Sequence, residues 1–149
     1  MLYRRAQRRF LSQIDLAAVE AAIRDSERST TGEIRIAILP RVRGTLEKAA
    51  KHAAARFGMT ATPERNGVLV LVDPARRTFL VWADTAIHER AGAAFWATVA
   101  AAMEERFRKG DFTGGLESGI AVVGRELAAH FPAGPAGHRD RLPDRVETS

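Results

Sequence analysis

A run of apolar residues constrains the fold of this chain more than any other feature of its sequence. Residues 68–72 read Val-Leu-Val-Leu-Val, and the turn residues Asp73-Pro74 follow at once. An uninterrupted apolar run of this kind is typical of a strand that is covered on both faces. We therefore predict that residues 68–72 form the central strand of a sheet with helices packed on each side.

The neighbouring segments supply two further strands. Residues 33–39 alternate, with isoleucines on one face, and this period of two predicts a strand. Residues 78–83 follow the Asp73-Pro74 turn and predict an antiparallel hairpin partner. Because a helical segment separates the first two strands, we expect those strands to run parallel, joined by a right-handed crossover. The predicted order places residues 68–72 in the middle.

Helical periodicity predicts the layers that cover this sheet. Ser12 is expected to cap a first helix that runs towards Ser29, and residues 46–57 form a second. Residues 93–109 form a long helix, and a last helix runs from about Gly114 to Phe131. The predicted fold class is therefore α/β, a three-layer α/β/α sandwich with a small mixed sheet made of a parallel pair and an antiparallel hairpin strand.

The two ends of the chain differ in composition from its middle. The net charge is +5, and four of the positive charges come from one short segment: Arg4, Arg5, Arg8 and Arg9. We expect a basic N-terminal extension over residues 1–11 and a nearly neutral α/β domain over residues 12–131. From Pro132 onward, proline and glycine stand among charges that cancel, which predicts a disordered tail over residues 132–149.

Several function classes are excluded by missing residue types and motifs. The chain has no cysteine, which removes disulfides, thiol catalysis and cysteine-ligated metals. It has no nucleophile elbow, no Walker-type phosphate loop and no H-E-x-x-H motif. Because the excess positive charge is confined to the N-terminal segment, we expect no nucleic-acid partner. Neither a signal peptide nor a membrane-spanning segment is evident, so the sequence predicts a cytoplasmic protein.

Polar residues meet at one edge of the predicted sheet. Glu33 begins the first strand, Asn66 precedes the second, and Asp84 ends the third, which runs in the opposite direction. Carboxylate and amide oxygens are ligands for a hard divalent cation such as calcium or magnesium. The alternative is structural: Glu33 pairs with a nearby arginine (Arg35 or Arg65), Asn66 forms an Asx-type turn, and Asp84 caps a following short helix.

Five motifs follow one another through the predicted domain. They are Thr31-Gly32-Glu33-Ile34, Arg65-Asn66-Gly67-Val68-Leu69, Asp84 with Ile87, Phe95-Trp96, and Phe107-Arg108-Lys109-Gly110-Asp111-Phe112 with Gly115-Leu116. Their order and spacing, over about residues 10–132, resemble the short, single-domain bacterial branch of the TPM domain family. The resemblance implies an α/β/α sandwich and, in some members, a divalent-cation site. The family's phosphatase label rests on its thylakoid-lumen members.

Carried over residue by residue, the resemblance implies that the motif acids are Glu33, Asp84 and Asp111, with Asn66 as their polar partner. Where many short members have Gly-Asp-Lys-Gly, this chain has Ala83-Asp84-Thr85-Ala86. The missing lysine removes a charge that could contact phosphate, whereas the carboxylate is kept. The alternative for Asp111 is that it caps the last helix near the helix's positive end.

Two functions follow from these features. The first is a TPM-domain-like protein that holds calcium or magnesium at one sheet edge, with weak phosphomonoester hydrolysis in which the cation polarises a phosphoryl oxygen. The second is a non-catalytic module that docks a protein partner or an anionic membrane surface, assisted by the N-terminal arginines.

Overall fold

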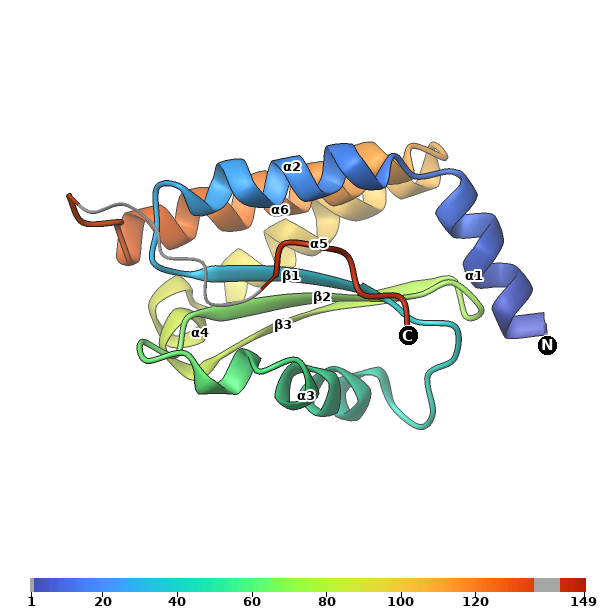
Figure 1. Cartoon of the computed structure of the whole chain (residues 1–149), viewed down its shortest axis with the longest axis horizontal. Helices are drawn as coiled ribbons and strands as arrows, with labels where there is room; N and C mark the ends of the chain where they lie inside the picture. Colours follow the sequence, from blue (N-terminus) through green and yellow to red (C-terminus); the bar gives the residue numbers. More distant parts are fainter. Residues whose placement is uncertain (1, 136–142) are drawn as a thin grey trace.

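The computed structural model describes residues 2–135 and 143–149 and contains a three-stranded mixed sheet (Figure 1). Its strands are β1 (Glu33–Ile38), β2 (Gly67–Asp73) and β3 (Thr78–Ala83), in the order β1-β2-β3. β1 runs parallel to β2, and β3 runs antiparallel to β2. The predicted strand order and directions are confirmed.

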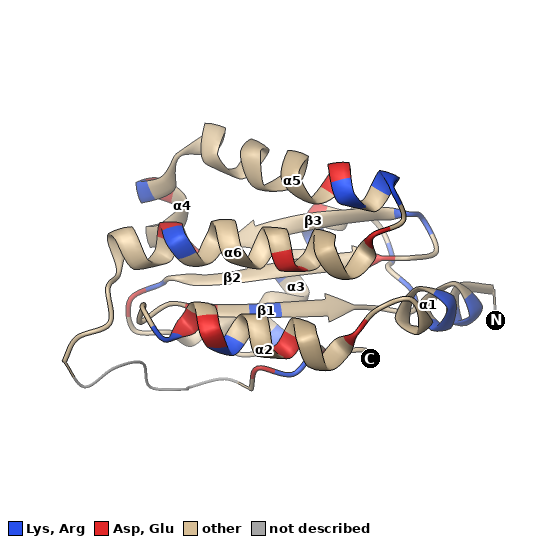
Figure 2. Ribbon diagram, turned by 90° about the horizontal axis from the view of Figure 1, so that it is seen from above, with Lys and Arg blue, Asp and Glu red and all other residues tan. Residues whose placement is uncertain are grey.

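Helices cover both faces of the sheet. One face carries α2 (Leu16–Glu27), α5 (Ala93–Arg108) and α6 (Phe112–His130), and the other carries α3 (Leu46–Arg56) and the 3₁₀ turn η1 (Met59–Ala61) (Figure 1). A short helix, α4 (Thr85–Ala91), follows β3. Seen from above, α2 and α6 lie side by side across the sheet (Figure 2). This arrangement is the three-layer α/β/α sandwich that the sequence predicts.

The central strand separates two apolar cores. Val68, Val70 and Val72 pack towards α2, α5 and α6, where they join the larger core. Leu69 and Leu71 point the opposite way and pack towards α3. All five side chains are buried. The uninterrupted apolar run is thus explained, because neither face of β2 meets solvent.

Two predicted helix starts are wrong by a few residues. Ser12 ends a helix, α1 (Leu2–Ser12), instead of capping the next one. Asp15 is the N-cap of α2, and its carboxylate accepts a hydrogen bond from the Ala18 backbone N–H at 3.0 Å. The last helix begins at Phe112 rather than at Gly114. In both cases an aspartate supplies the capping oxygen, and aspartate caps as well as serine does.

The N-terminal arginines belong to a helix that is attached to the domain. Gln7 of α1 is buried, and its side-chain amide donates to the carbonyls of Ile38 at 2.9 Å and Thr148 at 2.5 Å. Phe10, in the last turn of α1, packs against Phe112 with the ring centroids 4.9 Å apart. Residues 2–11, which we expected to extend beyond the domain, are therefore held against it.

The C-terminal residues also differ from the expected disordered tail. Glu147 pairs with β1: its carbonyl accepts from the Ile38 N–H at 2.8 Å, and its N–H donates to the Ile36 carbonyl at 2.9 Å. Its side chain forms an ion pair with the buried Arg35, and Val146 is buried. β1 is an edge strand whose backbone groups need partners, and composition does not reveal this pairing. Residues 136–142 of the predicted tail lie outside the described residues.

Candidate functional site

The sheet brings three of the four predicted site residues to one edge. The strand register pairs Glu33 with Gly67 and Val68 with Ala83. Glu33, Asn66 and Asp84 therefore occupy neighbouring positions where the three strands begin or end. All three are buried, with exposed fractions of 1%, 0% and 2%.

Asp84 is held by an arginine. Its carboxylate accepts two hydrogen bonds from Arg65, one from Nε at 2.7 Å and one from Nη2 at 2.9 Å. These contacts raise the pKa of the Arg65 guanidinium above its usual value. Asp84 Oδ1 also accepts from the Thr85 N–H at 2.7 Å, at the start of α4. The structural alternative for Asp84, a helix cap, is confirmed. Arg65, one of the two arginines expected to pair with Glu33, pairs with Asp84.

Asn66 has an oxygen that hydrogen bonds leave unused. Its side-chain Nδ2 donates to Thr31 Oγ1 at 3.1 Å. Asn66 Oδ1 is buried and has no hydrogen-bond partner among the residues that the structure describes. The predicted Asx-type turn, in which Oδ1 would accept from a following N–H, is therefore not formed. A buried polar oxygen without a partner is rare, and an amide oxygen is a suitable ligand for a hard cation.

A fourth polar residue at this edge, Glu27, was not predicted. Glu27 ends α2 and is buried, and its Oε2 accepts from the Ile34 N–H at 2.7 Å. Burial raises the pKa of Glu27 to about 10, helped by a hydrogen bond with the Asp144 side chain and by the nearby charge of Glu33. The Glu27 carboxyl is therefore protonated at neutral pH, unless a cation replaces the proton.

The sequence did carry a signal for Glu27. The apolar stripe of this helix runs through Leu16, Val19 and Ile23, and the next position on the same stripe is Glu27. A carboxylate in line with core residues is forced into the core when the helix packs. We name Glu27, Glu33, Asn66 and Asp84 together the sheet-edge cluster.

Asp111 does not belong to the sheet-edge cluster. It caps α6, where Oδ1 accepts from the Gly114 N–H at 2.9 Å, and Oδ2 pairs with Arg106 Nη1 at 3.1 Å. The other end of α6 lies at the cluster, since the Thr31 N–H donates to the Phe131 carbonyl at 3.0 Å. The 19 residues of α6 separate the two ends by about 28 Å. The capping alternative is confirmed for Asp111.

Two negative findings apply to residues 2–135 and 143–149. In those ranges, no three or more acidic, histidine or cysteine side chains are grouped so that they could hold a metal ion. A cation at the cluster would therefore depend on the Asn66 amide oxygen as well as on carboxylates. The same ranges contain no helix with the length and apolar character needed to cross a membrane.

Comparisons with known proteins agree on the fold. A family model described as the TPM domain matches residues 5–126. The NMR structure of the BA42 protein from the psychrophilic bacterium Bizionia argentinensis has a TM-score of 0.84 and 31% identity, covering 90% of this chain and 92% of that chain. No curated protein matches the chain.

Two more distant solved structures share the fold. The N-terminal domain of the cg2496 protein from Corynebacterium glutamicum has a TM-score of 0.60 and 17% identity, covering 84% of this chain and 77% of that chain. The N-terminal domain of a P. gingivalis protein has a TM-score of 0.60 and 20% identity, covering 81% of this chain and 76% of that chain.

Proposed function

Because the chain belongs to the TPM domain family, we propose that it is a divalent-cation-binding domain whose site is the sheet-edge cluster. The observation that carries this proposal is the Asn66 Oδ1 atom, which is buried without a hydrogen-bond partner in the described part of the chain. It lies at the edge where the buried carboxylates of Glu33 and Asp84 also lie. These three residues would hold calcium or magnesium.

The electrostatics of the cluster favour a cation. The charge of Glu33 is close enough to Glu27 to raise the pKa of that group, so the two carboxyl groups repel one another when both are ionised. A divalent ion would relieve this repulsion. It would also let Glu27 lose its proton, so cation binding should release protons and strengthen as the pH rises.

Arg65 controls access to Asp84 in this proposal. Its side chain is 49% exposed, whereas that of Asp84 is 2% exposed. The guanidinium can therefore turn into solvent while the carboxylate stays in place, and a cation would then have to replace the counter-charge that Asp84 loses. A cation and Arg65 would compete for the same oxygens of Asp84.

Binding without efficient turnover is the activity we propose. A bound cation would supply Lewis-acid polarisation of a phosphoryl oxygen. Thr85 stands where many family members have a lysine, so that position supplies no charge to grip a phosphate. We therefore expect slow phosphomonoester hydrolysis at most.

The test is thermal unfolding with increasing calcium or magnesium. A ligand that binds only the folded state stabilises it by about 2.7 kcal/mol at one hundred times its dissociation constant. The melting temperature of the parent should rise saturably, and Asp84→Asn and Glu33→Gln should lose most of that rise. Asp111→Asn is the matched control, because it removes the same charge at the far end of α6. A parent that does not respond contradicts the proposal.

Hydrolysis is measured separately with p-nitrophenyl phosphate. We expect binding of the cation with little or no turnover. Metal-dependent turnover that Asp84→Asn abolishes would instead make the domain a phosphatase.

A further inference from the structure

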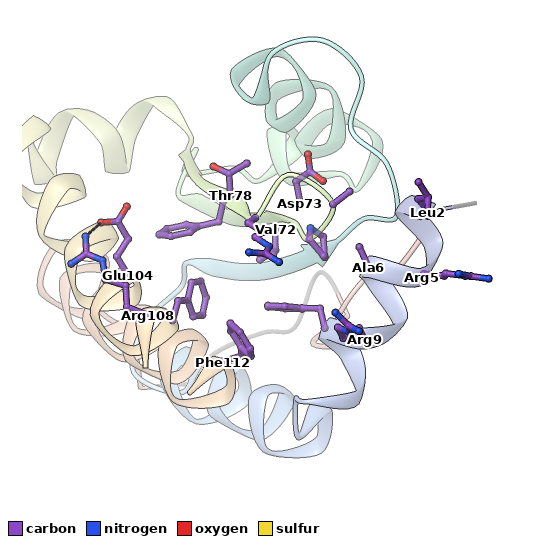
Figure 3. Close-up of a pocket in the computed structure, with 16 residues that line it drawn as sticks. Leu2, Arg5, Ala6, Arg9, Val72, Asp73, Thr78, Glu104, Arg108 and Phe112 are labelled. Atoms are coloured by element: carbon purple, nitrogen blue, oxygen red, sulfur yellow. Dashed lines mark hydrogen bonds and ion pairs between the residues drawn. The ribbon is translucent and has the colours of Figure 1, made fainter. Parts of the chain in front are cut away.

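A concave surface lies at the end of the sheet opposite to the sheet-edge cluster. It is a pocket of about 960 Å³ between α1, the turn that joins β2 to β3, and the adjoining ends of α5 and α6 (Figure 3). Val72 and Asp73, which end β2, line it, whereas the sheet-edge cluster adjoins the start of β2. Its volume is that of a site for a small organic molecule. This pocket is independent of the proposed cation site.

Phenylalanine rings supply the apolar part of the pocket. Four of them line it and remain partly exposed: Phe10, Phe79, Phe107 and Phe112. The rings of Phe79 and Phe107 meet edge to face with centroids 5.3 Å apart, and those of Phe107 and Phe112 are tilted at 5.7 Å. The rings come from four different elements and still leave apolar surface open to the pocket. Such surface favours an apolar or aromatic ligand body.

The charges that line the pocket are not balanced. Its two acids are already paired, Glu104 with Arg108 at 3.4 Å and Asp73 with Arg76 at 3.3 Å. Three other lining arginines, Arg5, Arg9 and Arg77, have no ion-pair partner within the described ranges. Arg5 and Arg9 come from α1 (Figure 3), whose basic residues stand out in Figure 2. The pocket thus has surplus positive charge on two sides.

The backbone conformation of the turn between β2 and β3 does not favour an arginine at position 77. The backbone φ of Arg77 is +53°, in the left-handed region. Turns with this geometry favour glycine or asparagine, because a larger side chain is strained there. The arginine at this position is one of the residues of the turn that line the pocket.

We propose that this pocket binds an organic carboxylate with an apolar body. The phenylalanine rings would contact the body, and Arg9 and Arg77 would contact the carboxylate. Arginine is suited to this role because its planar guanidinium can make two hydrogen bonds to one carboxylate. The N-terminal arginines then act as one wall of a defined site and not only as a diffuse basic patch.

The test uses 2-naphthoate as the probe, with titration calorimetry on the full chain. Naphthalene-2-carboxamide has the same ring without the charge, and acetate has the charge without the ring. We expect saturable binding of 2-naphthoate and at least tenfold weaker binding of each of the other two. Equal binding of the carboxamide, or no binding of 2-naphthoate, overturns the proposal.

Two pairs of arginines on α1 give matched variants. Arg5→Gln with Arg9→Gln alters pocket residues, and Arg4→Gln with Arg8→Gln removes the same charge from exposed positions that do not line the pocket. Losing a charged hydrogen bond should weaken 2-naphthoate binding about tenfold in the first pair. The second pair should change 2-naphthoate binding by less than about twofold, since its exposed charges do not line the pocket and are screened by salt.

Arg77→Gln distinguishes carboxylate binding in the pocket from the alternative that α1 is a basic helix that binds a membrane. The proposal expects this variant to weaken 2-naphthoate binding about tenfold, because Arg77 lines the pocket from the turn and not from α1. Circular dichroism establishes that the variant is folded. If both α1 pairs lose equal affinity and Arg77→Gln loses none, the proposal is wrong. Binding of the parent to phosphatidylglycerol vesicles, and not to phosphatidylcholine vesicles, would then assign α1 to an anionic surface.

Discussion

Arg65 grips Asp84 through two hydrogen bonds, from Nε at 2.7 Å and from Nη2 at 2.9 Å, at the edge where the three strands meet. Both oxygens of a buried carboxylate are thus occupied by a side chain that is half exposed. Asp84 also caps α4, so a cation at the proposed site would have to displace Arg65 from these oxygens. The arginine holds the position that a cation would take.

Removing the arginine should strengthen cation binding. In Arg65→Gln, Asp84 loses its competing partner, so we expect the dissociation constant for calcium to fall about tenfold. The melting temperature without calcium should fall, because a buried carboxylate loses its counter-charge. Calorimetric titration measures the first effect and thermal unfolding the second. Weaker calcium binding in Arg65→Gln would show that the arginine helps to build the site.

Stability should depend on pH through Glu27. Burial raises its pKa in the fold from 4.5 to about 10. The folded chain therefore binds this proton more tightly than the unfolded chain does. The contribution of Glu27 to the free energy of unfolding is complete below about pH 4.5 and declines as the pH rises towards 10. Over this range, from roughly pH 5 to pH 9, the free energy of unfolding of the parent should fall as Glu27 loses the stabilising effect of its proton. Glu27→Gln should flatten that decline.

The measurement is urea unfolding at several pH values. The exposed Glu105 gives a matched control, because Glu105→Gln removes an acid from the surface of α5. Equal slopes for the parent and Glu27→Gln would mean that Glu27 is ionised in the fold.

Shortening a buried side chain of the central strand should lower the free energy of unfolding markedly. Leu71 is fully buried on the α3 side of β2, so Leu71→Ala should lower the free energy of unfolding by about 2–5 kcal/mol. Leu80 on β3 is partly buried against the same core, and Leu80→Ala should cost less. Chemical denaturation of both variants checks this ranking. A nearly neutral Leu71→Ala would contradict the central place of β2.

Truncation before Pro143 should destabilise the domain. It would expose the core around Val146 and leave the Arg35 guanidinium, which is 5% exposed, without Glu147. We expect a loss of more than about 2 kcal/mol in the free energy of unfolding. Composition alone would have predicted a neutral truncation, because the segment has no periodic apolar face. A melting temperature within a degree or two of the parent's would show that the segment adds nothing.

The strands of the sheet could be predicted from the sequence because each strand is indicated by the pattern of its own residues. The uninterrupted apolar run at residues 68–72 is typical of a strand covered on both faces, and the period of two that begins at Glu33 is typical of a strand as well. Strand order followed from connection rules. The same connection rules predict that Glu33, Asn66 and Asp84 lie at one edge, which the strand register confirms.

What the sequence did not predict depends on contacts between distant residues. Nothing near Gln7 or Glu147 indicates that both would satisfy backbone groups beside β1. Asp111 shares a family motif set with Asp84, but motif order does not say which end of a long helix faces the cluster. Glu27 continues the apolar stripe of its helix, and an acid at such a position indicates a buried carboxyl group, which the structure confirms.

The most direct test of the cation site follows the side-chain amide of Asn66 by NMR during a calcium titration. The account predicts a saturable shift of the Asn66 Nδ2 resonances, with matching shifts in the backbone amides of Glu33 and Asp84. The amides around Asp111, at the far end of α6, should stay unchanged. An Asn66 amide that does not move at saturating calcium, or shifts confined to exposed acids, would contradict the sheet-edge cluster as a cation site.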